Sequence, residues 1–148
     1  FYLAGDVADT FEGRAQMVAL HAALVIRRIN AVGGTESAKL AAALNERVLD
    51  GFDAAYREQG VGDSSIARKM RKLAEAHYGL GKAISTALDE ADRESAVIDV
   101  LERNGVTQKG KAPGLATYLM SLADRLKLQP DSEIMAGNPA WQDLSKTP

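Results

Sequence analysis

The chain has 148 residues, 46% of them hydrophobic and 26% charged, and its formal net charge is −2. This composition is typical of a folded globular protein, and the small net charge argues against nucleic-acid binding by bulk electrostatics. Because the chain contains no cysteine, disulfides, thiolate metal sites and cysteine nucleophiles are excluded. No apolar run reaches the roughly 20 residues that a membrane-spanning helix needs.

The length predicts a single helical domain over residues 1–148. No segment alternates apolar and polar residues as a strand does, so the expected fold class is all-α. We expect a compact bundle of about five to six helices with an irregular C-terminal tail. Because the chain begins at Phe1 rather than methionine, we also expect a leading segment, with its targeting information, to precede it.

The first predicted helix begins near Thr10 or Asp9, either of which can cap it, and ends at Gly33 and Gly34. Apolar residues that recur at steps of three and four predict its buried face: Phe11, Ala15, Val18, Ala22, Val25 and Ile29. This helix is therefore expected to pack against the core along most of its length.

A polar stripe runs along the flank of the first helix, where Arg14, His21 and Arg28 follow one another at intervals of seven residues. Such a stripe usually borders a neighbouring helix, and its long side chains extend past that helix into solvent. The alternative is a polar rim around a groove that receives a segment of a partner. The sequence leaves both interpretations open.

The second predicted helix has Thr35 or Ser37 as its cap and runs to about Glu58. Its expected core face consists of Ala41, Val48, Leu49, Phe52 and Tyr56. Gly60 is expected to end the helix, because glycine adopts the left-handed backbone conformation at little cost.

The stretch from Gly60 to Leu88 has the most regular helical pattern, and we expect the other helices to be arranged around it. Asp63 or Ser64 can cap this third helix. Its apolar stripe is long and narrow and consists of Ile66, Met70, Leu73, His77, Leu80, Ile84, Leu88 and Ala91. Gly79 and Gly81 lie inside the pattern and predict a kink, a close crossing by another helix, or a break into two helices.

The first turns of the third helix carry four cations: Arg68, Lys69, Arg71 and Lys72. The helix dipole disfavours cations at this end, and each exposed one costs about 0.3–1 kcal/mol. Residues 57–82 carry six basic and three acidic residues, whereas residues 85–105 carry two basic and six acidic ones. The cluster is either balanced by nearby acids on a solvated face or used by a partner.

Asp92 is the expected cap of a fourth helix that ends at Asn104 and Gly105. Pro113 is expected at the first position of a fifth helix, which Pro130 ends. The predicted core faces of these two helices are Val97, Val100 and Leu101, and Leu115, Leu119, Leu122 and Leu126.

The tail, residues 131–148, is expected to contain one further turn around Pro139, Ala140 and Trp141. Trp141 is the only tryptophan of the chain. We expect its large apolar ring to cover the core from the tail.

Few residues suit catalysis. His77 interrupts an apolar stripe and is best interpreted as a core histidine, and no pair of histidines has metal-ligand spacing. Ser64 and Ser65 lack the strand-to-helix turn of a nucleophilic serine, and the Gly60–Gly62 turn lacks the ending of a phosphate-binding loop. The residues favour a helical binding module without a cofactor. A haem-handling protein that uses His21 and His77 is a third, weaker alternative.

Three stretches carry a more specific pattern. The first is DTFEGR at residues 9–14, with LH at 20–21 and RRI at 27–29. The second is REQGVGD at residues 57–63, with KM at 69–70 and AEAHYG at 74–79. The third is RN at residues 103–104, followed by the 115–122 helix. Together they resemble the ubiquinol–cytochrome c chaperone family, the assembly factors of the cytochrome bc1 complex.

The resemblance implies an all-helical, non-enzymatic chaperone that binds newly made cytochrome b and helps it reach the bc1 complex. In mitochondria, family members act with a small partner protein near the ribosomal exit. The alanine-rich, cysteine-free sequence suggests a bacterial relative, located in the cytoplasm at the inner membrane; a eukaryotic protein would lie on the matrix side. His77 departs from the family pattern, which has phenylalanine at this position.

The residue pattern and the resemblance together predict an apolar groove for a hydrophobic client segment, with a polar rim that holds its register. The expected partner-binding residues are Arg14, His21, Arg28, Arg57, Gly60, Gly62, Asp63, Lys69, Lys72 and Tyr78. The basic residues are also candidates for contacts with anionic lipid or ribosomal RNA. A ribosome- or RNA-associated helical module is accordingly the alternative function.

Overall fold

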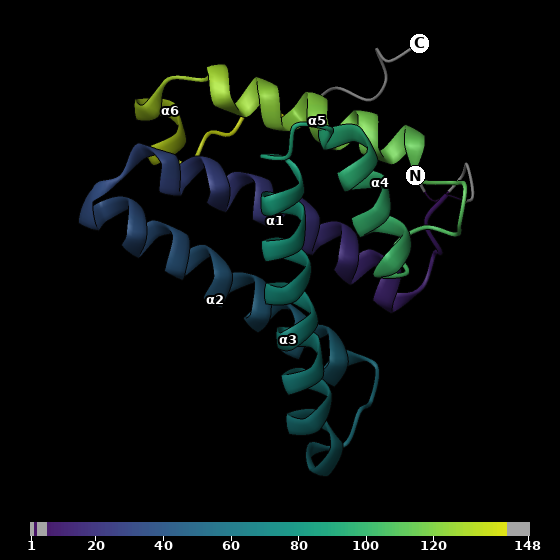
Figure 1. The fold of residues 1–148 in the computed structure, drawn as a ribbon. Coiled ribbons are helices and arrows are strands. Elements are labelled where there is room, and N and C mark those ends of the chain that lie inside the picture. The colour runs from purple at the N-terminus through teal and green to yellow at the C-terminus, as the bar shows by residue number, and fades with distance from the viewer. Residues whose placement is uncertain (1, 3–5, 142–148) are drawn as a thin grey trace.

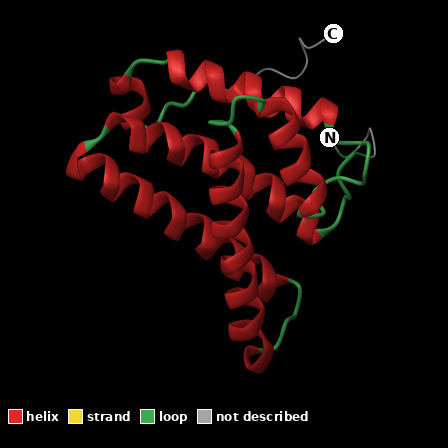
Figure 2. Cartoon of the chain, in the orientation of Figure 1, coloured by secondary structure: helices red, strands yellow, loops and turns green. Residues whose placement is uncertain are grey.

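Six helices follow one another in the part of the chain that the computed structural model describes, residues 2 and 6–141. They are α1 (Phe11–Val32), α2 (Gly34–Glu58), α3 (Asp63–Ala87), α4 (Arg93–Arg103), α5 (Pro113–Leu128) and α6 (Asp131–Met135). The described residues contain no strand, only an isolated antiparallel bridge between Val7 and Thr107. The predicted all-α bundle of five to six helices is confirmed (Figure 1, Figure 2).

The central helix is α1 rather than α3, because α2, α3, α5 and α6 all pack against α1. Figure 1 shows α1 running between α5 and α2, with α3 crossing it. Ten residues of α1 are buried: Gly13, Ala15, Met17, Ala19, Leu20, Ala22, Ala23, Leu24, Val25 and Ile29. A helix that is apolar on several sides is expected to lie inside a bundle. The prediction that the chain is arranged around Gly60–Leu88 is therefore wrong.

Two of the predicted helix caps are present. The backbone N–H of Gly13 donates to Thr10 Oγ1 over 3.1 Å at the start of α1. At the start of α4, the N–H of Ser95 donates to Asp92 Oδ1 over 3.2 Å. These bonds satisfy N–H groups that have no partner inside the helix. Pro113 also stands at the first position of α5, as predicted.

Two other predicted caps are wrong. α2 begins at Gly34, directly after Gly33, so that Thr35 and Ser37 lie inside the helix, and the Ser37 hydroxyl donates to the Gly34 carbonyl. α3 begins at Asp63, and Gly62 is its cap residue. Gly33 has a φ of +79°, a left-handed conformation that favours glycine, whereas Gly62, with a φ of −67°, is extended in a way that any residue can adopt.

The α1–α3 crossing explains one of the two glycines inside α3. A Cβ atom added to Gly81 would lie 3.4 Å from the Cβ of Ala23 in α1, whereas one added to Gly79 would meet no atom within 4 Å. α3 is a continuous helix across both positions. The predicted close crossing is confirmed at Gly81, and the alternative break into two helices is wrong.

Between α5 and Trp141 the chain forms a short helix that the sequence pattern did not identify, and residues 142–148 of the predicted tail lie outside the described residues. Pro130 ends α5 as expected, but it also precedes the short helix α6, whose Ile134 is buried against α1. Trp141 is 51% exposed and does not cover the core. The segment between α6 and Trp141 instead lies along one side of a groove on α1.

The predicted core faces of α4 and α5 are confirmed, because all seven of their residues are buried. On α1 the prediction fails at Val18, which is 47% exposed although its neighbours in the stripe are mostly buried. On α3 it fails at Ala91, which lies beyond the end of the helix and is exposed. The exposure of Val18 marks a place where α1 is left uncovered by the other helices.

Candidate binding site

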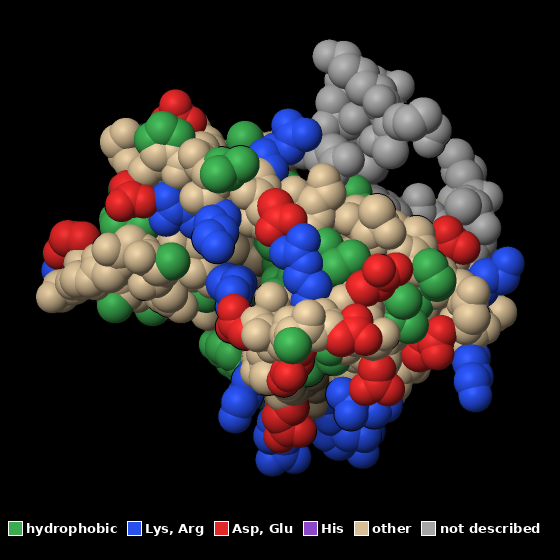
Figure 3. Space-filling view, turned by 45° about the horizontal axis from the view of Figure 1, so that its top comes forward, with side chains coloured by type: hydrophobic (Ala, Val, Ile, Leu, Met, Phe, Trp, Pro, Cys, Tyr) green, Lys and Arg blue, Asp and Glu red, His purple; other side chains and the backbone are tan. Residues whose placement is uncertain are grey.

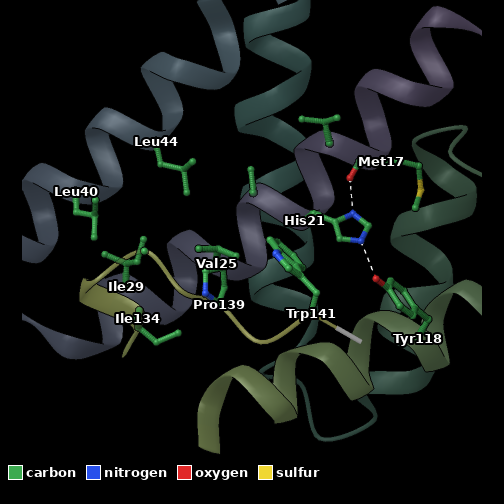
Figure 4. Close-up of a pocket in the computed structure, with 13 residues that line it drawn as sticks. Met17, His21, Val25, Ile29, Leu40, Leu44, Tyr118, Ile134, Pro139 and Trp141 are labelled. Carbon is green, nitrogen blue, oxygen red and sulfur yellow. Dashed lines mark hydrogen bonds between the residues drawn. The ribbon is translucent and has the colours of Figure 1, made fainter. Parts of the chain in front are cut away.

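The uncovered part of α1 forms the floor of an open pocket of about 650 Å³, which we call the apolar groove (Figure 4). Its walls come from α2, α5, α6 and the segment that follows α6. It is lined by Met17, Val18, His21, Ala22, Val25, Ile29, Leu40, Leu44, Tyr118, Ile134, Gly137, Pro139 and Trp141. Nearly all of these side chains are apolar, so the groove suits a hydrophobic ligand rather than a charged one.

The groove is open because the residues around it are too small or too distant to close it. Ala22 leaves space on the floor, while Leu40 and Leu44 of α2 form one wall and remain half-buried. Val18 and Trp141 are each about half exposed at its edge. Exposed apolar surface of this kind is costly in water unless a partner covers it.

His21 and Tyr118 form the polar pair of the groove. The Nδ1 atom of His21 lies 2.7 Å from the Met17 carbonyl oxygen, so Nδ1 carries the proton and donates. In the neutral imidazole, Nε2 then accepts from the Tyr118 hydroxyl at 2.8 Å (Figure 4). Burial raises the pKa of the Tyr118 hydroxyl, which keeps this donor protonated at neutral pH.

Aromatic rings continue from this pair toward the edge of the groove. The His21 ring lies 5.6 Å from the Tyr118 ring and 5.8 Å from the Trp141 ring, measured between centroids. Figure 4 shows the three side chains side by side at one end of the groove. Trp141 therefore borders the groove, where its ring has an apolar face and a wet edge.

Arg28 has a structural role at the far end of α1. Its side chain is only 10% exposed, and it donates from Nε to the Leu126 carbonyl at 2.8 Å and from Nη2 to the Gln129 carbonyl at 2.7 Å. It is also paired with Asp131. These bonds connect α1 to the end of α5 and the start of α6, and so they hold one wall of the groove in place.

Arg27 connects α1 to the end of α3. Its Nη1 donates to Ser85 Oγ at 3.0 Å and to Asp89 Oδ2 at 2.8 Å. The Arg27 guanidinium lowers the pKa of the Asp89 carboxyl, which therefore stays ionised over the physiological range. Both neighbouring arginines of the RRI motif thus fix helices to one another.

The ten predicted partner-binding residues do not gather in one place. Within the described chain, only His21 lines the apolar groove. Arg14 is exposed beyond one end and is paired with Asp9 at 2.7 Å. Arg57 is paired with Asp53 at 2.7 Å near the end of α2. The polar stripe on α1 therefore runs past the groove rather than around it.

The remaining predicted residues belong to the α2–α3 turn and to α3. Gly60 has a φ of +75° and ends α2 as expected, and Gly62 and Asp63 start α3. Lys69 lies with Nζ 5.7 Å from the centre of the Tyr56 ring. Lys72 and Tyr78 are exposed, Tyr78 to 52%. We call the first turns of α3, with Arg68, Lys69, Arg71 and Lys72, the basic tip.

The basic tip is not paired with any acidic side chain that the structure describes. Seven ion pairs join described side chains, and none of them includes a cation of the tip. Figure 1 shows these turns of α3 projecting away from the rest of the molecule. Figure 3 shows a group of Lys and Arg side chains at the same lower end.

His77 is a buried residue between α2 and α3, as predicted. It is 4% exposed, and its Nε2 donates to Asn45 Oδ1 at 2.8 Å. Nδ1 then carries no proton, and it is buried without a hydrogen-bond partner among the described residues. Burial lowers the pKa of His77, which is therefore neutral at physiological pH.

A bis-histidine haem site is not supported by this geometry. Both ring nitrogens of His21 are hydrogen-bonded, and His21 and His77 line different pockets. Among the described residues, no group of three or more His, Asp or Glu side chains is placed to hold a metal ion.

The sequence did not identify most of the groove. Leu40 and Leu44 were not assigned a face, although their spacing of four residues places them on one side of α2. Tyr118 flanks the leucine stripe of α5, and only the tertiary structure shows that it meets His21 across 97 residues. Ile134 belongs to a helix too short to be recognised from its pattern.

The fold and the groove are those of an all-helical binding protein with an open apolar site. Among the described residues, no helix is long and apolar enough to cross a membrane. The family model described as "Ubiquinol-cytochrome C chaperone" matches residues 4–141, and the chain belongs to this family. The match includes every residue of the groove and of the basic tip.

A solved structure supports the same assignment. The chain is similar to the crystal structure of the Cbp3 homolog from Brucella abortus, with a TM-score of 0.83 and 29% identity. The alignment covers 100% of this chain and 82% of that one. A search of curated proteins finds no match. The resemblance inferred from the three sequence stretches is thereby confirmed. The solved structure that the chain resembles is from a bacterium.

Proposed function

We propose that the protein is a non-enzymatic assembly chaperone of the cytochrome bc1 complex, and that its client is newly made or unassembled cytochrome b. The observation that carries the proposal is the apolar groove in a chain of this family. An unassembled membrane subunit exposes hydrophobic segments, and a helical segment lying in a groove buries its apolar side chains against Val18, Val25 and Leu44.

The groove also offers a means of fixing the position of the client. The His21–Tyr118 pair lies at one end of an otherwise apolar lining. A polar group of the client placed there would exchange hydrogen bonds with the pair, and a displaced segment would leave a polar group without a partner. Of the predicted partner-binding residues, His21 is the one that this role uses directly.

The proposed location is the cytoplasmic side of the inner membrane in a bacterium, where the client is inserted. A ribosome- or RNA-associated module is not our choice, because the family description names a chaperone.

Site-specific photo-crosslinking tests the groove. A photoreactive residue at Val18, which is exposed at the groove edge, is expected to crosslink to cytochrome b in respiring membranes. The same residue at Glu94, which is exposed on α4 and is not part of the groove lining, is the control and is expected to give no such product. Equal crosslinking from both positions, or none from Val18, would contradict the proposal.

A genetic test measures the consequence. Deletion of the gene is expected to lower cytochrome b and bc1 activity, and the wild-type gene restores both. Val18→Asp is expected to restore them poorly, because it places a charge on the apolar groove wall. Ala54→Asp, an exposed position of α2 with the same charge change, is the control and should restore both fully. Normal bc1 levels in the deletion strain would refute the proposed function.

A further inference from the structure

The apolar groove does not explain the basic tip. We propose that the basic tip and the outer face of α3 form a docking surface for an anionic lipid bilayer. This inference deepens the proposed function, because it states where the chaperone would meet a membrane-inserted client. Its test, however, uses only this chain and lipid vesicles.

The cations of α3 lie on one side of the helix. At 100° per residue, Arg68, Arg71, Lys72 and Lys82 fall within about 100° of arc, opposite the stripe that contains Ile66 and Ile84. All four are exposed, whereas both isoleucines are buried. The face is therefore directed to solvent and is not used for packing.

This face has kept its positive charge. Glu75 is the acidic residue of α3 on the same side, and it forms no ion pair with the cations among the described contacts. The positive end of the helix dipole adds to the charge at the first turns. Elsewhere, Arg27, Arg28 and Arg93 are each paired with an aspartate. The unpaired cluster therefore stands apart from the arginines that hold helices together.

The shape of the face fits a plane better than a nucleic acid strand. From Arg68 to Lys82 the face extends over about 21 Å at 1.5 Å per residue, along a helix that projects from the molecule (Figure 1). Proteins that follow single-stranded RNA use cationic grooves with exposed aromatic platforms. Here the cations lie on a projecting helix rather than in a groove, Tyr56 next to the tip is half-buried under Lys69, and Tyr78 is a single exposed ring rather than a series.

Two other features fit a bilayer surface. Tyr78, which is 52% exposed, lies at the edge of the cationic face, and tyrosine is favoured at the level of lipid headgroups. Residues 85–105 carry six acidic and two basic residues, so an anionic surface would repel that part of the molecule. The resulting charge asymmetry would orient the chain with the basic tip toward the membrane.

The test is co-sedimentation of the purified chain with vesicles of phosphatidylcholine, alone or with phosphatidylglycerol. We expect binding only when phosphatidylglycerol is present, and weaker binding as salt rises. Arg68→Glu/Lys72→Glu should weaken binding by about 25-fold or more, since about 1 kcal/mol per cation corresponds to about fivefold. The neutral variant Arg71→Gln/Lys82→Gln should weaken it by a similar factor.

The matched control is Lys109→Glu/Lys111→Glu, which makes the same charge change in the exposed loop before α5. It should weaken binding by less than about threefold, because it lies away from the docking face. Circular dichroism verifies that each variant is folded. Equal losses in the tip and control variants, or no binding of the wild-type chain to anionic vesicles, would overturn the inference.

Single-stranded RNA at the same salt concentration distinguishes the other class of partner. Tighter binding to RNA than to anionic vesicles, lost on Arg68→Glu/Lys72→Glu, would assign the basic tip to RNA and overturn the lipid inference. Vesicle binding that fails while Val18 still crosslinks to cytochrome b would refute the docking surface alone. Intact vesicle binding without the crosslink would refute the client assignment alone.

Discussion

Arg28 at the groove end of α1 and Arg68 on the basic tip of α3 are both arginines on amphipathic helices, yet their surroundings differ. Arg28 is almost buried and donates to two carbonyl groups and a carboxylate. Arg68 is exposed and forms no ion pair with a described side chain. The donors of Arg28 therefore hold helices together, whereas those of Arg68 face solvent and are available to a partner.

The same difference extends to the uncharged polar groups. At the groove end, both nitrogens of His21 have hydrogen-bond partners. In the α2–α3 hairpin, Nδ1 of His77 is buried without one. The polar pair of the groove is therefore satisfied within the fold, whereas α3 carries one buried nitrogen without a described partner and a set of cations that face solvent. Four substitutions test this contrast.

The largest effect is expected at Arg28. Arg28→Ala removes the side-chain donor to the Gln129 carbonyl and one of the two donors to the Leu126 carbonyl, and it leaves Asp131 without its cation, which should lower the free energy of unfolding by about 3 kcal/mol. Arg28→Lys should recover only part of the loss, because lysine lacks the planar fork. Urea denaturation measures both. If Arg28→Ala lowered the free energy of unfolding no more than the substitution of an exposed arginine does, the structural role of Arg28 would be contradicted.

His77 is expected to make stability depend on pH. Its pKa is lowered by folding, so below about pH 6.5 the unfolded chain binds a proton that the folded chain does not. The free energy of unfolding should therefore fall on acidification, by at most about 1.4 kcal/mol per pH unit. Above about pH 6.5, the full contribution of neutral His77 to stability is retained. His77→Phe should remove this part of the dependence. An unchanged slope in denaturation curves at pH 5 to 7 would show that His77 is not the group responsible.

Tyr118→Phe tests the polar pair in the groove. The variant keeps the ring beside His21 but removes the hydroxyl that donates to Nε2, which should cost about 1 kcal/mol of stability. Thermal unfolding provides the measurement, and His21→Ala/Tyr118→Phe completes a double-mutant cycle. Additive effects of the two substitutions would mean that the pair is not coupled.

The smallest effect is expected at the basic tip, and it has the opposite sign. Arg68→Gln removes the repulsion between Arg68 and the cations Arg71 and Lys72, three and four residues further along α3, and should raise stability by about 0.3 kcal/mol. Thermal unfolding at low salt is the most sensitive measurement. A clear loss of stability would show that the tip cations support the fold, contrary to the comparison.

The sequence predicted the helices better than their arrangement. The six-residue face of α1, the leucine stripe of α5 and the Thr10 and Asp92 caps depend on interactions within a few residues, and the structure confirms nearly all of them. The predicted caps of α2 and α3 were wrong: α2 follows Gly33, whose φ is +79°, and α3 follows Gly62 in an extended conformation. The central helix is α1, because it packs against other helices on several sides. A search for one apolar face per helix does not reveal this.

The candidate site was predicted only in outline. An apolar groove was expected, and His21, one of the predicted partner-binding residues, lines it; Leu44, Tyr118 and Ile134 meet at the groove from three different helices. Their contacts span many residues of chain, so no local pattern contains them. Arg28 was interpreted as a rim residue, and whether it also touches a partner stays a prediction.

By itself, the sequence determined the helical class, the cluster of cations and the family pattern. Each of these depends on residues that are close together in the chain. Only the tertiary structure decided which cations are paired and where apolar surface stays open. Burial and pairing depend on side chains far apart in the chain, and a hydrogen bond such as that between His21 and Tyr118 exists only once α1 and α5 have packed together.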